Sequence, residues 1–389
     1  MLRKIEIFSL FVYLLILFTG CSEDINTETY DIENGEGDIF INVDSNYTDI
    51  YNPQDTIDAE DDVRDDLALD IQDISDVNQG FDSPQFVANR DYLPLLKRLI
   101  QSAEKNIIIL HQEFLTGSTL DQLQNDIISA KKRGVDVTVL LEKDISDNAS
   151  RVDTLKSQGI NASLDTSSKT LHLKLFLSDN KYVLLGSTNL SYSSFQYNNE
   201  VDFFSDDTTL VSKFYEYANG VLSNNGNLQK IYCTNCGVIP IGDSQYDDLV
   251  TPYMNSAQKR LYIIVYQFDY DTDSSTPNGK ITKAILDAKS RGLDVKILFE
   301  YSSFDNTLNS TNQKTGNYLK SKGIDVRFDS KDITTHAKLL IADDRVVIYS
   351  GNWVYSALTS NHEVGVIVDY SKITESALNY FNALFNSAK

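Results

Sequence analysis

The chain has 389 residues, of which 41% are hydrophobic, and a formal net charge of −22 at pH 7. This length excludes a single small core and allows two domains that each bury a core of their own. A charge this negative, if it covered the whole surface, would argue against a polyanionic substrate. Residues 22–85, however, hold 20 Asp and Glu residues against one Arg, so residues 86–389 carry a net charge of only −4.

The first 20 residues have the layout of a secretory signal. Arg3 and Lys4 precede a mainly apolar run over residues 7–18, and small residues stand directly before Cys21. The run is shorter than the roughly 20 apolar residues that a membrane-spanning helix needs, and an acidic tract follows it. We therefore expect residues 1–20 to be a signal peptide and the protein to be exported; a single spanning helix is the alternative.

The sequence Leu-Phe-Thr-Gly-Cys over residues 17–21 resembles the lipobox of prokaryotic lipoproteins, although Phe18 stands where that pattern usually has Leu. The resemblance implies that Cys21 is lipidated and becomes the first residue of the mature chain. It also implies a membrane-anchored lipoprotein on the outer side of the cytoplasmic membrane or on the cell surface.

An acidic segment follows the predicted lipidation site. Residues 21–85 contain Gly35, Gly37, Pro53 and the acidic run over residues 60–62, and they have little apolar content. Like charges repel one another, and so few apolar side chains cannot offset the entropy lost on folding. We therefore predict a disordered tether between the lipid and the rest of the protein. An acidic tail that binds a partner is the alternative.

Two cysteines form a lone C-x-x-C pair. Cys233 and Cys236 lie in a polar stretch, and the chain has no second cysteine pair to complete a four-ligand zinc site. In an exported protein such a pair is typical of a local disulfide, which is what we predict. A redox-active pair is the other interpretation.

An internal repeat organises the rest of the chain. The stretch from about residue 86 to 206 recurs from about 238 to 369. In both copies an apolar run of strand length is followed by a helical pattern that ends at Gly134 or Gly292, and then by a buried strand. Strands that alternate with helices predict an α/β unit with a largely parallel sheet.

The repeat predicts the domain organisation. We expect two similar α/β domains over residues 86–222 and 238–389, joined by a linker over residues 223–237 that contains the C-x-x-C pair. Each domain is predicted to be a mostly parallel mixed sheet flanked by helices. Because a duplication can supply both halves of one site, we expect a single active site at the interface of the two domains.

Each copy contains the same polar motif, H-x-K followed by Asp, by Asn and, eleven residues after that Asn, by Glu. The first copy has His172, Lys174, Asp179, Gly186, Ser187, Asn189 and Glu200. The second copy has His336, Lys338, Asp343, Ser350, Asn352 and Glu363. These residues resemble the paired H-x-K-D motifs of the phospholipase D superfamily, and the resemblance covers roughly residues 86 to 375. It implies two phospholipase D-like domains that share one site.

The residue types suit phosphodiester chemistry. Side chains two apart on a strand face the same side, so each histidine shares a face with the lysine of its H-x-K. Positive ammonium groups and amide donors stabilise the oxygens of a five-coordinate phosphorus, so neither a metal nor another cofactor is required. We assign phosphate binding to Lys174, Lys338, Asn189, Asn352 and Ser187.

The two histidines are expected to have different catalytic roles. One imidazole, held as the neutral tautomer, attacks phosphorus while the other, protonated, gives its proton to the leaving alcohol, and the roles reverse when water cleaves the phosphohistidine. The resemblance implies that His172 is the nucleophile and His336 the acid. It also implies that Glu200 and Glu363 orient the histidines, and Asp179 and Asp343 are expected to be structural.

Three details accompany the motif. The spacing from Asp343 to Asn352 is one residue shorter than in the first copy, so we expect Ser350 to lack the role of Ser187. His111 at the end of a strand is interpreted as a core residue. His362, beside Glu363, is expected to border the pocket.

The motif does not select the substrate, because the superfamily includes lipid-cleaving enzymes, phosphatidyl synthases and nucleases. The synthases usually carry membrane-spanning segments before their motifs, and a lipid anchor places the enzyme at a membrane surface. We therefore expect hydrolysis of phospholipid to phosphatidic acid and free headgroup. A secreted endonuclease is the alternative, although the basic residues 131–133 and 259–260 lie at helix ends. A non-catalytic surface lipoprotein is a further possibility, but both H-x-K motifs are intact.

Overall fold

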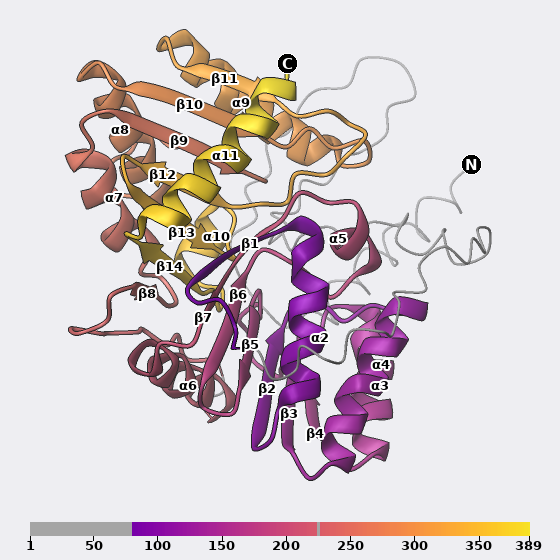
Figure 1. Ribbon diagram of the computed structural model, residues 1–389. Coiled ribbons are helices and arrows are strands. Elements are labelled where there is room, and N and C mark those ends of the chain that lie inside the picture. The colour runs from indigo at the N-terminus through magenta and orange to yellow at the C-terminus, as the bar shows by residue number, and fades with distance from the viewer. Residues whose placement is uncertain (1–79, 224–225) are drawn as a thin grey trace, which may run out of the picture. The chain divides into compact units, whose positions relative to one another are not determined.

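The computed structural model describes residues 80–223 and 226–389, and the predicted signal peptide, Cys21 and nearly all of the predicted tether lie outside these residues. The described chain contains two seven-stranded sheets, one formed before and one after residues 224–225 (Figure 1). We call residues 80–223 the N-terminal lobe and residues 226–389 the C-terminal lobe.

The N-terminal lobe has the strand order β1-β7-β6-β5-β2-β3-β4. Its strands are β1 (Gln85–Ala88), β2 (Asn106–His111), β3 (Asp136–Leu141), β4 (Asn161–Leu164), β5 (Lys174–Ser178), β6 (Tyr182–Gly186) and β7 (Val201–Ser205). Its helices are η3 (Asn89–Asp91), α2 (Tyr92–Ser102), α3 (Ser118–Lys132), α4 (Ser146–Ser157), α5 (Tyr192–Gln196) and α6 (Thr208–Ser223).

The C-terminal lobe repeats this order, as β8-β14-β13-β12-β9-β10-β11. Its strands are β8 (Ile239–Ile241), β9 (Arg260–Val265), β10 (Asp294–Phe299), β11 (Asp325–Phe328), β12 (Leu339–Ala342), β13 (Arg345–Tyr349) and β14 (Gly365–Val368). Its helices are α7 (Tyr246–Ser256), α8 (Pro277–Ser290), α9 (Asn306–Ser321), α10 (Tyr355–Thr359) and α11 (Ser371–Ser387). The identical order means that each strand of one lobe has a structural equivalent in the other.

The predicted fold class of two similar mixed sheets flanked by helices is confirmed, but the sheets are less parallel than predicted. In each sheet only two of the six strand pairings are parallel, β2-β3 and β3-β4 in the first and β9-β10 and β10-β11 in the second. The other four pairings are antiparallel. The short turns after β5 and after β12 account for one antiparallel pairing in each sheet, because a connection of two or three residues joins only antiparallel neighbours.

One hydrophobic cluster joins the two lobes. It combines one face of each sheet, including Leu175 and Leu339, with apolar residues of α6 and α11, including Phe214 and Phe381. A fully buried Leu or Phe stabilises a fold by about 1.5–3 kcal/mol, so a shared cluster of this kind holds the two sheets together. The opposite faces are covered separately, by α2, α3 and α4 in the first lobe and by α7, α8 and α9 in the second.

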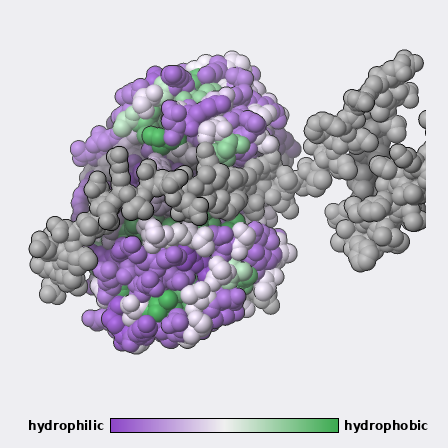
Figure 2. Space-filling model, turned by 90° about the vertical axis from the view of Figure 1, so that its right-hand side faces the viewer, coloured by the Kyte–Doolittle hydropathy of each residue, from purple (hydrophilic) through white to green (hydrophobic). Residues whose placement is uncertain are grey.

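Two further features concern the surface and the connection. On the face drawn in Figure 2, hydrophilic residues cover most of the described surface and hydrophobic residues form small separate patches. In the described part of the chain, no helix has both the length and the apolar character needed to cross a membrane. In the segment that enters the C-terminal lobe, Cys233 and Cys236 are joined by a disulfide with a Cα–Cα distance of 5.7 Å.

Candidate active site

The segments that contain the two motif histidines meet residues of the opposite lobe. The backbone N–H of His172 donates to the carbonyl of His362 at 3.1 Å, and the N–H of His336 donates to the carbonyl of Asn199 at 3.0 Å. Leu171 and Thr335, the residues before the histidines, form isolated bridges with His362 and Asn199. Each histidine segment is therefore fixed by the residue that precedes the motif glutamate of the other lobe.

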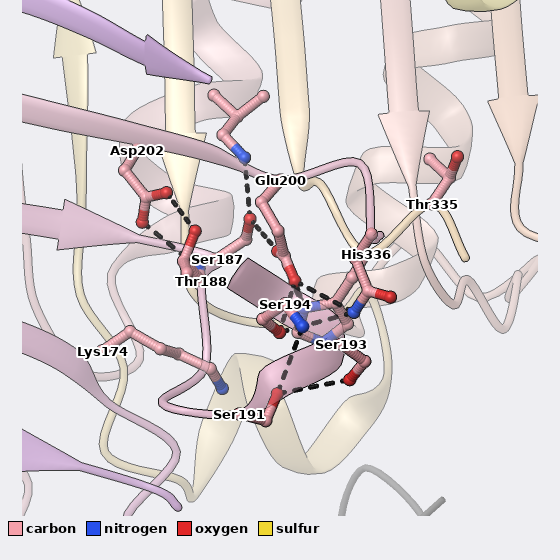
Figure 3. Close-up of polar contacts among 12 residues, drawn as sticks. Lys174, Ser187, Thr188, Ser191, Ser193, Ser194, Glu200, Asp202, Thr335 and His336 are labelled. Carbon is pink, nitrogen blue, oxygen red and sulfur yellow. Dashed lines mark hydrogen bonds and ion pairs between the residues drawn. The ribbon is translucent and has the colours of Figure 1, made fainter. Parts of the chain in front are cut away.

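The same crossing pairs the side chains. Nδ1 of His172 lies 2.9 Å from the Glu363 carboxylate. Nδ1 of His336 lies 3.0 Å from the Glu200 carboxylate, and Figure 3 shows this second pair. Both histidines are at most 4% exposed, and both glutamates are fully buried. A carboxylate only accepts hydrogen bonds, so each Nδ1 carries the proton and each Nε2 is left for chemistry. Neither lobe contains a complete His–Glu pair of its own.

Glu200 is held in its ionised form. Burial by itself raises the pKa of this carboxyl group, but His336, Lys338 and the hydroxyl of Ser187 outweigh the effect of burial. The pKa of Glu200 therefore lies below its ordinary value. An ionised Glu200 keeps the proton on Nδ1 of His336 and stabilises the imidazolium form of that ring.

Each of the two lysines follows its histidine by two residues, but the two lysines have different neighbours. Nζ of Lys174 lies 3.1 Å from Nε2 of His172 and 2.8 Å from Oε1 of Gln112. Nζ of Lys338 lies over the Tyr266 ring, 5.0 Å from its centroid, and this ring packs edge-on against His336. Gln112 and Tyr266 both directly follow the second strand of their lobe, so this position makes the two halves of the site unequal.

The Ser187 hydroxyl, which we predicted to bind phosphate, contacts the orienting glutamate Glu200. It donates to Glu200 at 2.6 Å and accepts the N–H of Val201 at 2.9 Å. The Ser350 hydroxyl in the same way donates to Glu363 and accepts the N–H of Val364. Both hydroxyl groups therefore support the orienting glutamates, and each uses its single proton for that contact.

The expectation that Ser350 lacks the role of Ser187 is wrong. Asn189 follows Ser187 by two residues, and Asn352 follows Ser350 by the same number. The missing residue lies earlier, in the hairpin turn, which takes residues 179–181 in the first lobe and residues 343–344 in the second. The two asparagines are therefore equivalent, at 7% and 5% exposed, and the amide oxygen of Asn189 is buried without a hydrogen-bond partner.

Asp179 and Asp343 lie at the opposite ends of β5 and β12 from the histidines. Both residues adopt left-handed backbone angles, with φ of 57° and 54°. The Asp179 carboxylate accepts three consecutive backbone N–H groups at the start of β2, and that of Asp343 accepts three at the start of β9. These contacts anchor the second strand of each lobe and do not involve the histidines.

Asp179→Ala is expected to lower the free energy of unfolding by about 2 kcal/mol, because charge-assisted hydrogen bonds to three backbone donors are lost. Urea unfolding of the variant and of the unmodified chain would measure the difference. Asp136→Asn, a change at an exposed carboxylate, is the control and should leave the midpoint unchanged. An unchanged midpoint for Asp179→Ala would contradict the anchoring role.

Two further glutamates were missed by the sequence analysis. Glu142 and Glu300 directly follow β3 and β10, and both are buried. Their carboxyl groups accept the N–H of Leu171 and of Thr335, which immediately precede the histidines. Burial raises the pKa of Glu300 to about 8. The repeat could have indicated these two glutamates, because an acidic residue follows the equivalent apolar strand in both copies.

A set of buried polar residues fixes the backbone of the orienting glutamates. The N–H of Glu200 donates to Asn89, and that of Glu363 donates to Asp243, each at 2.8 Å. Tyr380 of α11 and Tyr217 of α6, each from the other lobe, donate their hydroxyl protons to the same two acceptors. These four residues occupy equivalent positions in the two lobes, and none of them belongs to the recognised motif.

The remaining histidines lie behind the site. Nδ1 of His362 lies 2.7 Å from Asp243 and its carbonyl accepts the His172 N–H, so it supports the site from within, whereas we expected it to border the pocket. His111 is buried opposite Lys174 in the pairing of β2 with β5. Burial and the charge of Lys174 both lower the pKa of His111, which keeps this core ring neutral.

The two lobes, each with an H-x-K motif, and the site that they share define a protein of the phospholipase D class. The family model described as "Cardiolipin synthase, PLD-like domain" matches residues 96–222 and 250–385. The chain therefore belongs to the phospholipase D-like family. Within residues 80–223 and 226–389, no group of three or more His, Cys, Asp or Glu side chains is placed to hold a metal ion.

Individual relatives are distant. "Phospholipase D" of Rickettsia prowazekii (strain Madrid E) is 26% identical over 157 residues, which are 40% of this chain and 69% of that protein. The structure of phosphatidylserine synthase from Haemophilus influenzae Rd KW20 superposes with a TM-score of 0.62 at 13% identity, covering 79% of this chain and 87% of that one. The polyphosphate kinase of Porphyromonas gingivalis gives a TM-score of 0.54 at 12% identity, covering 76% and 49%. At these identities the two structures establish a shared fold.

Proposed function

We propose that the protein hydrolyses phospholipid to phosphatidic acid and a free headgroup through a phosphohistidine intermediate. The observation that carries the proposal is the crossed arrangement in which each lobe orients the histidine of the other through a buried glutamate. Two oriented imidazoles with a lysine each are the groups that a two-step phosphoryl displacement needs. Membership of the phospholipase D-like family supports phosphodiester processing as the reaction class.

In the first step Nε2 of His172 attacks phosphorus, and the bond to the headgroup oxygen breaks. His336 gives its Nε2 proton to that oxygen, and the headgroup leaves as an alcohol. Lys174 lies beside the attacking nitrogen, so its charge is positioned to stabilise the phosphoryl oxygens as they gain negative charge. We assign the same stabilising role to Lys338, Asn189 and Asn352, which lie in other segments of the site.

In the second step water attacks the phosphohistidine, and the His172–phosphorus bond breaks. His336, now neutral, accepts the proton from this water and returns to its starting form. His172 leaves as a neutral imidazole whose Nδ1 proton is still held by Glu363. The products are phosphatidic acid and the enzyme in its original protonation state, so no other reactant is consumed.

The preference for phospholipid rests on location. We propose that the chain is exported and anchored through a lipid on Cys21, which would hold the two lobes at a membrane surface where phospholipid is the most abundant phosphodiester. The resemblance to the lipobox and the signal-like first 20 residues support this location. Residues 86–389 carry a net charge of only −4, so a field that would attract nucleic acid is not indicated.

Incubating the full chain in chelator with phosphatidylcholine vesicles and, in parallel, with single-stranded DNA tests the proposal. Release of choline together with phosphatidic acid is expected. DNA cleavage without choline release would move the assignment to an endonuclease. If neither substrate is turned over and Cys21 is lipidated, a surface lipoprotein without catalytic activity becomes the better interpretation.

Cys21→Ala is expected to abolish incorporation of labelled fatty acid when the full chain is expressed in a bacterial host. The protein should then move from the membrane fraction to the soluble exported fraction, because a covalent acyl chain contributes about 0.8 kcal/mol of membrane affinity per buried CH₂ group. Cys233→Ala serves as the control and should keep the label. Equal labelling of both variants would contradict lipidation at Cys21.

A further inference from the structure

We propose that Asp202 is a positioning residue whose buried carboxylate, acting behind Glu200, makes His336 the histidine that holds the proton when the reaction begins. This inference rests on the proposed two-histidine reaction and assigns a function to a residue outside its motif. It concerns the difference between the two halves of the site, which the repeated motif alone cannot supply.

Asp202 lies on β7, two residues after Glu200, and is fully buried (Figure 3). Its carboxylate has two hydrogen-bond donors, the backbone N–H of Thr188 at 3.2 Å and the hydroxyl of the same residue. Thr188 stands between Ser187, which supports Glu200, and Asn189. Asp202 is thus linked both to the orienting glutamate and to the phosphate-binding segment.

The C-terminal lobe has no carboxylate at this position. Gly365 is the equivalent of Asp202, Gly351 of Thr188 and Tyr349 of Gly186. The Tyr349 ring occupies the space, since a Cβ atom on Gly365 would lie 2.8 Å from it, while a Cβ atom on Gly186 would lie 2.5 Å from Asp202. A glycine and an Asp–Thr pair in one lobe thus correspond to a tyrosine and two glycines in the other.

The other half of the site has a buried carboxylate too, but its charge is compensated. Asp243, behind Glu363, accepts hydrogen bonds from His362, from the Tyr217 hydroxyl and from the backbone N–H groups of Gln229 and Glu363. One of these four partners is an imidazole, which can itself carry a positive charge. Asp202 has only the two donors of the neutral residue Thr188, so its charge is balanced less by its neighbours.

The groups around Asp202 come from several elements. Glu200 on the same strand repels its charge, His336 from the C-terminal lobe attracts it, and Tyr92 of α2 and Tyr380 of α11 are neutral neighbours. Burial raises the pKa of Asp202 to about 7, Thr188 opposes this rise, and Glu200 adds to it. The carboxyl group therefore becomes charged at and above neutral pH, which is where an imidazole otherwise loses its proton.

A second negative charge behind Glu200 favours the imidazolium form of His336 in a low-dielectric site. This charge therefore favours the proton on His336, whereas His172 has no equivalent of Asp202 behind its glutamate. The first histidine is left neutral to attack and the second is left charged to donate. The Asp-for-Gly difference acts together with the difference between Gln112 and Tyr266 in separating the roles of the two rings.

Asp202→Asn tests the inference, because the amide keeps the shape and both contacts with Thr188 while removing the charge. The chain has four histidines, so ring NMR signals of isotope-labelled histidine can be assigned by single substitutions. The His336 ring is expected to lose its proton about one pH unit lower in the variant, with His172 unchanged. If phospholipid is hydrolysed as proposed, the alkaline limb of kcat/KM shifts by the same amount, leaving about a tenfold lower activity at high pH.

Two variants control the test. Asp153→Asn removes an exposed carboxylate from α4 and should leave both titrations unchanged. Thr188→Val keeps Asp202 but removes the hydroxyl group that donates to its carboxylate. The loss of this donor favours the neutral carboxyl group, so the His336 titration should shift in the same direction as in Asp202→Asn. Thr188→Val replaces Asp202→Asn as the test if Asp202→Asn does not fold. An unchanged His336 titration in a folded variant overturns the inference. The NMR titration needs no substrate, so it tests the role of Asp202 even if phospholipid is not hydrolysed. Failure of the proposed function would appear only in the activity measurement.

Discussion

His336→Ala is expected to stop turnover of phospholipid and, with a substrate whose leaving group needs no acid, to leave the enzyme trapped as a phosphoryl adduct on His172. The first bond to phosphorus forms at Nε2 of His172, while the second step requires His336 to accept a proton from water. With a p-nitrophenyl phosphodiester, whose leaving group needs little help from an acid, the variant should release about one equivalent of nitrophenol and then stall. Mass spectrometry of the acid-sensitive adduct would locate it on His172.

His172→Ala should release no burst with the same substrate and should lower kcat by at least about 10⁴-fold, because the nucleophile is gone. The double variant is the matched control for non-enzymatic release. A burst from His172→Ala together with none from His336→Ala would reverse the assignment of the two roles. Absence of an adduct in both single variants, with turnover intact in the unmodified chain, would contradict the covalent mechanism.

The repeat and the motif predicted a large part of this structure, for a physical reason. Apolar runs at strand spacing and the glycines that end the helices are local signals, and they appear twice. The H-x-K spacing likewise brings His172 close to Lys174, although β5 begins only at the lysine. These features depend on residues that are neighbours in the chain.

Features that depend on distant contacts were not predictable from one sequence. The motif places Glu200 in the same copy as His172, yet its carboxylate pairs with His336, because the loop before β7 crosses to the other lobe. The motif spacing also suggested a shortened asparagine loop, whereas the shorter segment is the hairpin turn at Asp343. When one copy of a motif is a residue shorter, the missing residue can lie in any turn between the two motif residues that define the spacing.

Asp202 illustrates the same limit. It lies inside the apolar sequence of β7, between Val201 and Phe203, and nothing local distinguishes it from an exposed strand residue. Its burial follows from the sheet, where β1 and β6 cover its edges, and from Gly186, which leaves room for its side chain. The equivalent glycine in the second copy becomes meaningful only after the two lobes are aligned by strand order.

Glu363→Gln is expected to lower kcat by about 10²–10⁴-fold with phospholipid and with the p-nitrophenyl substrate alike. The carboxylate holds the Nδ1 proton of His172 and stabilises the positive ring that forms when Nε2 bonds to phosphorus. A neutral amide holds this proton less firmly and stabilises the positive ring less, so the attack on phosphorus slows. The attack by His172 depends on this carboxylate whichever leaving group the substrate carries, so the rates with both substrates should fall.

Glu200→Gln should separate the two substrates. Its partner His336 donates the proton to the leaving alcohol, so phospholipid turnover should fall by about 10²-fold or more, whereas the initial nitrophenol burst should fall less than about tenfold. Glu216→Gln, an exposed change on α6, is the matched control and should alter neither rate. Equal losses on both substrates for both glutamates would mean that the crossed pairs share one role, and the division between nucleophile and acid would have to be abandoned.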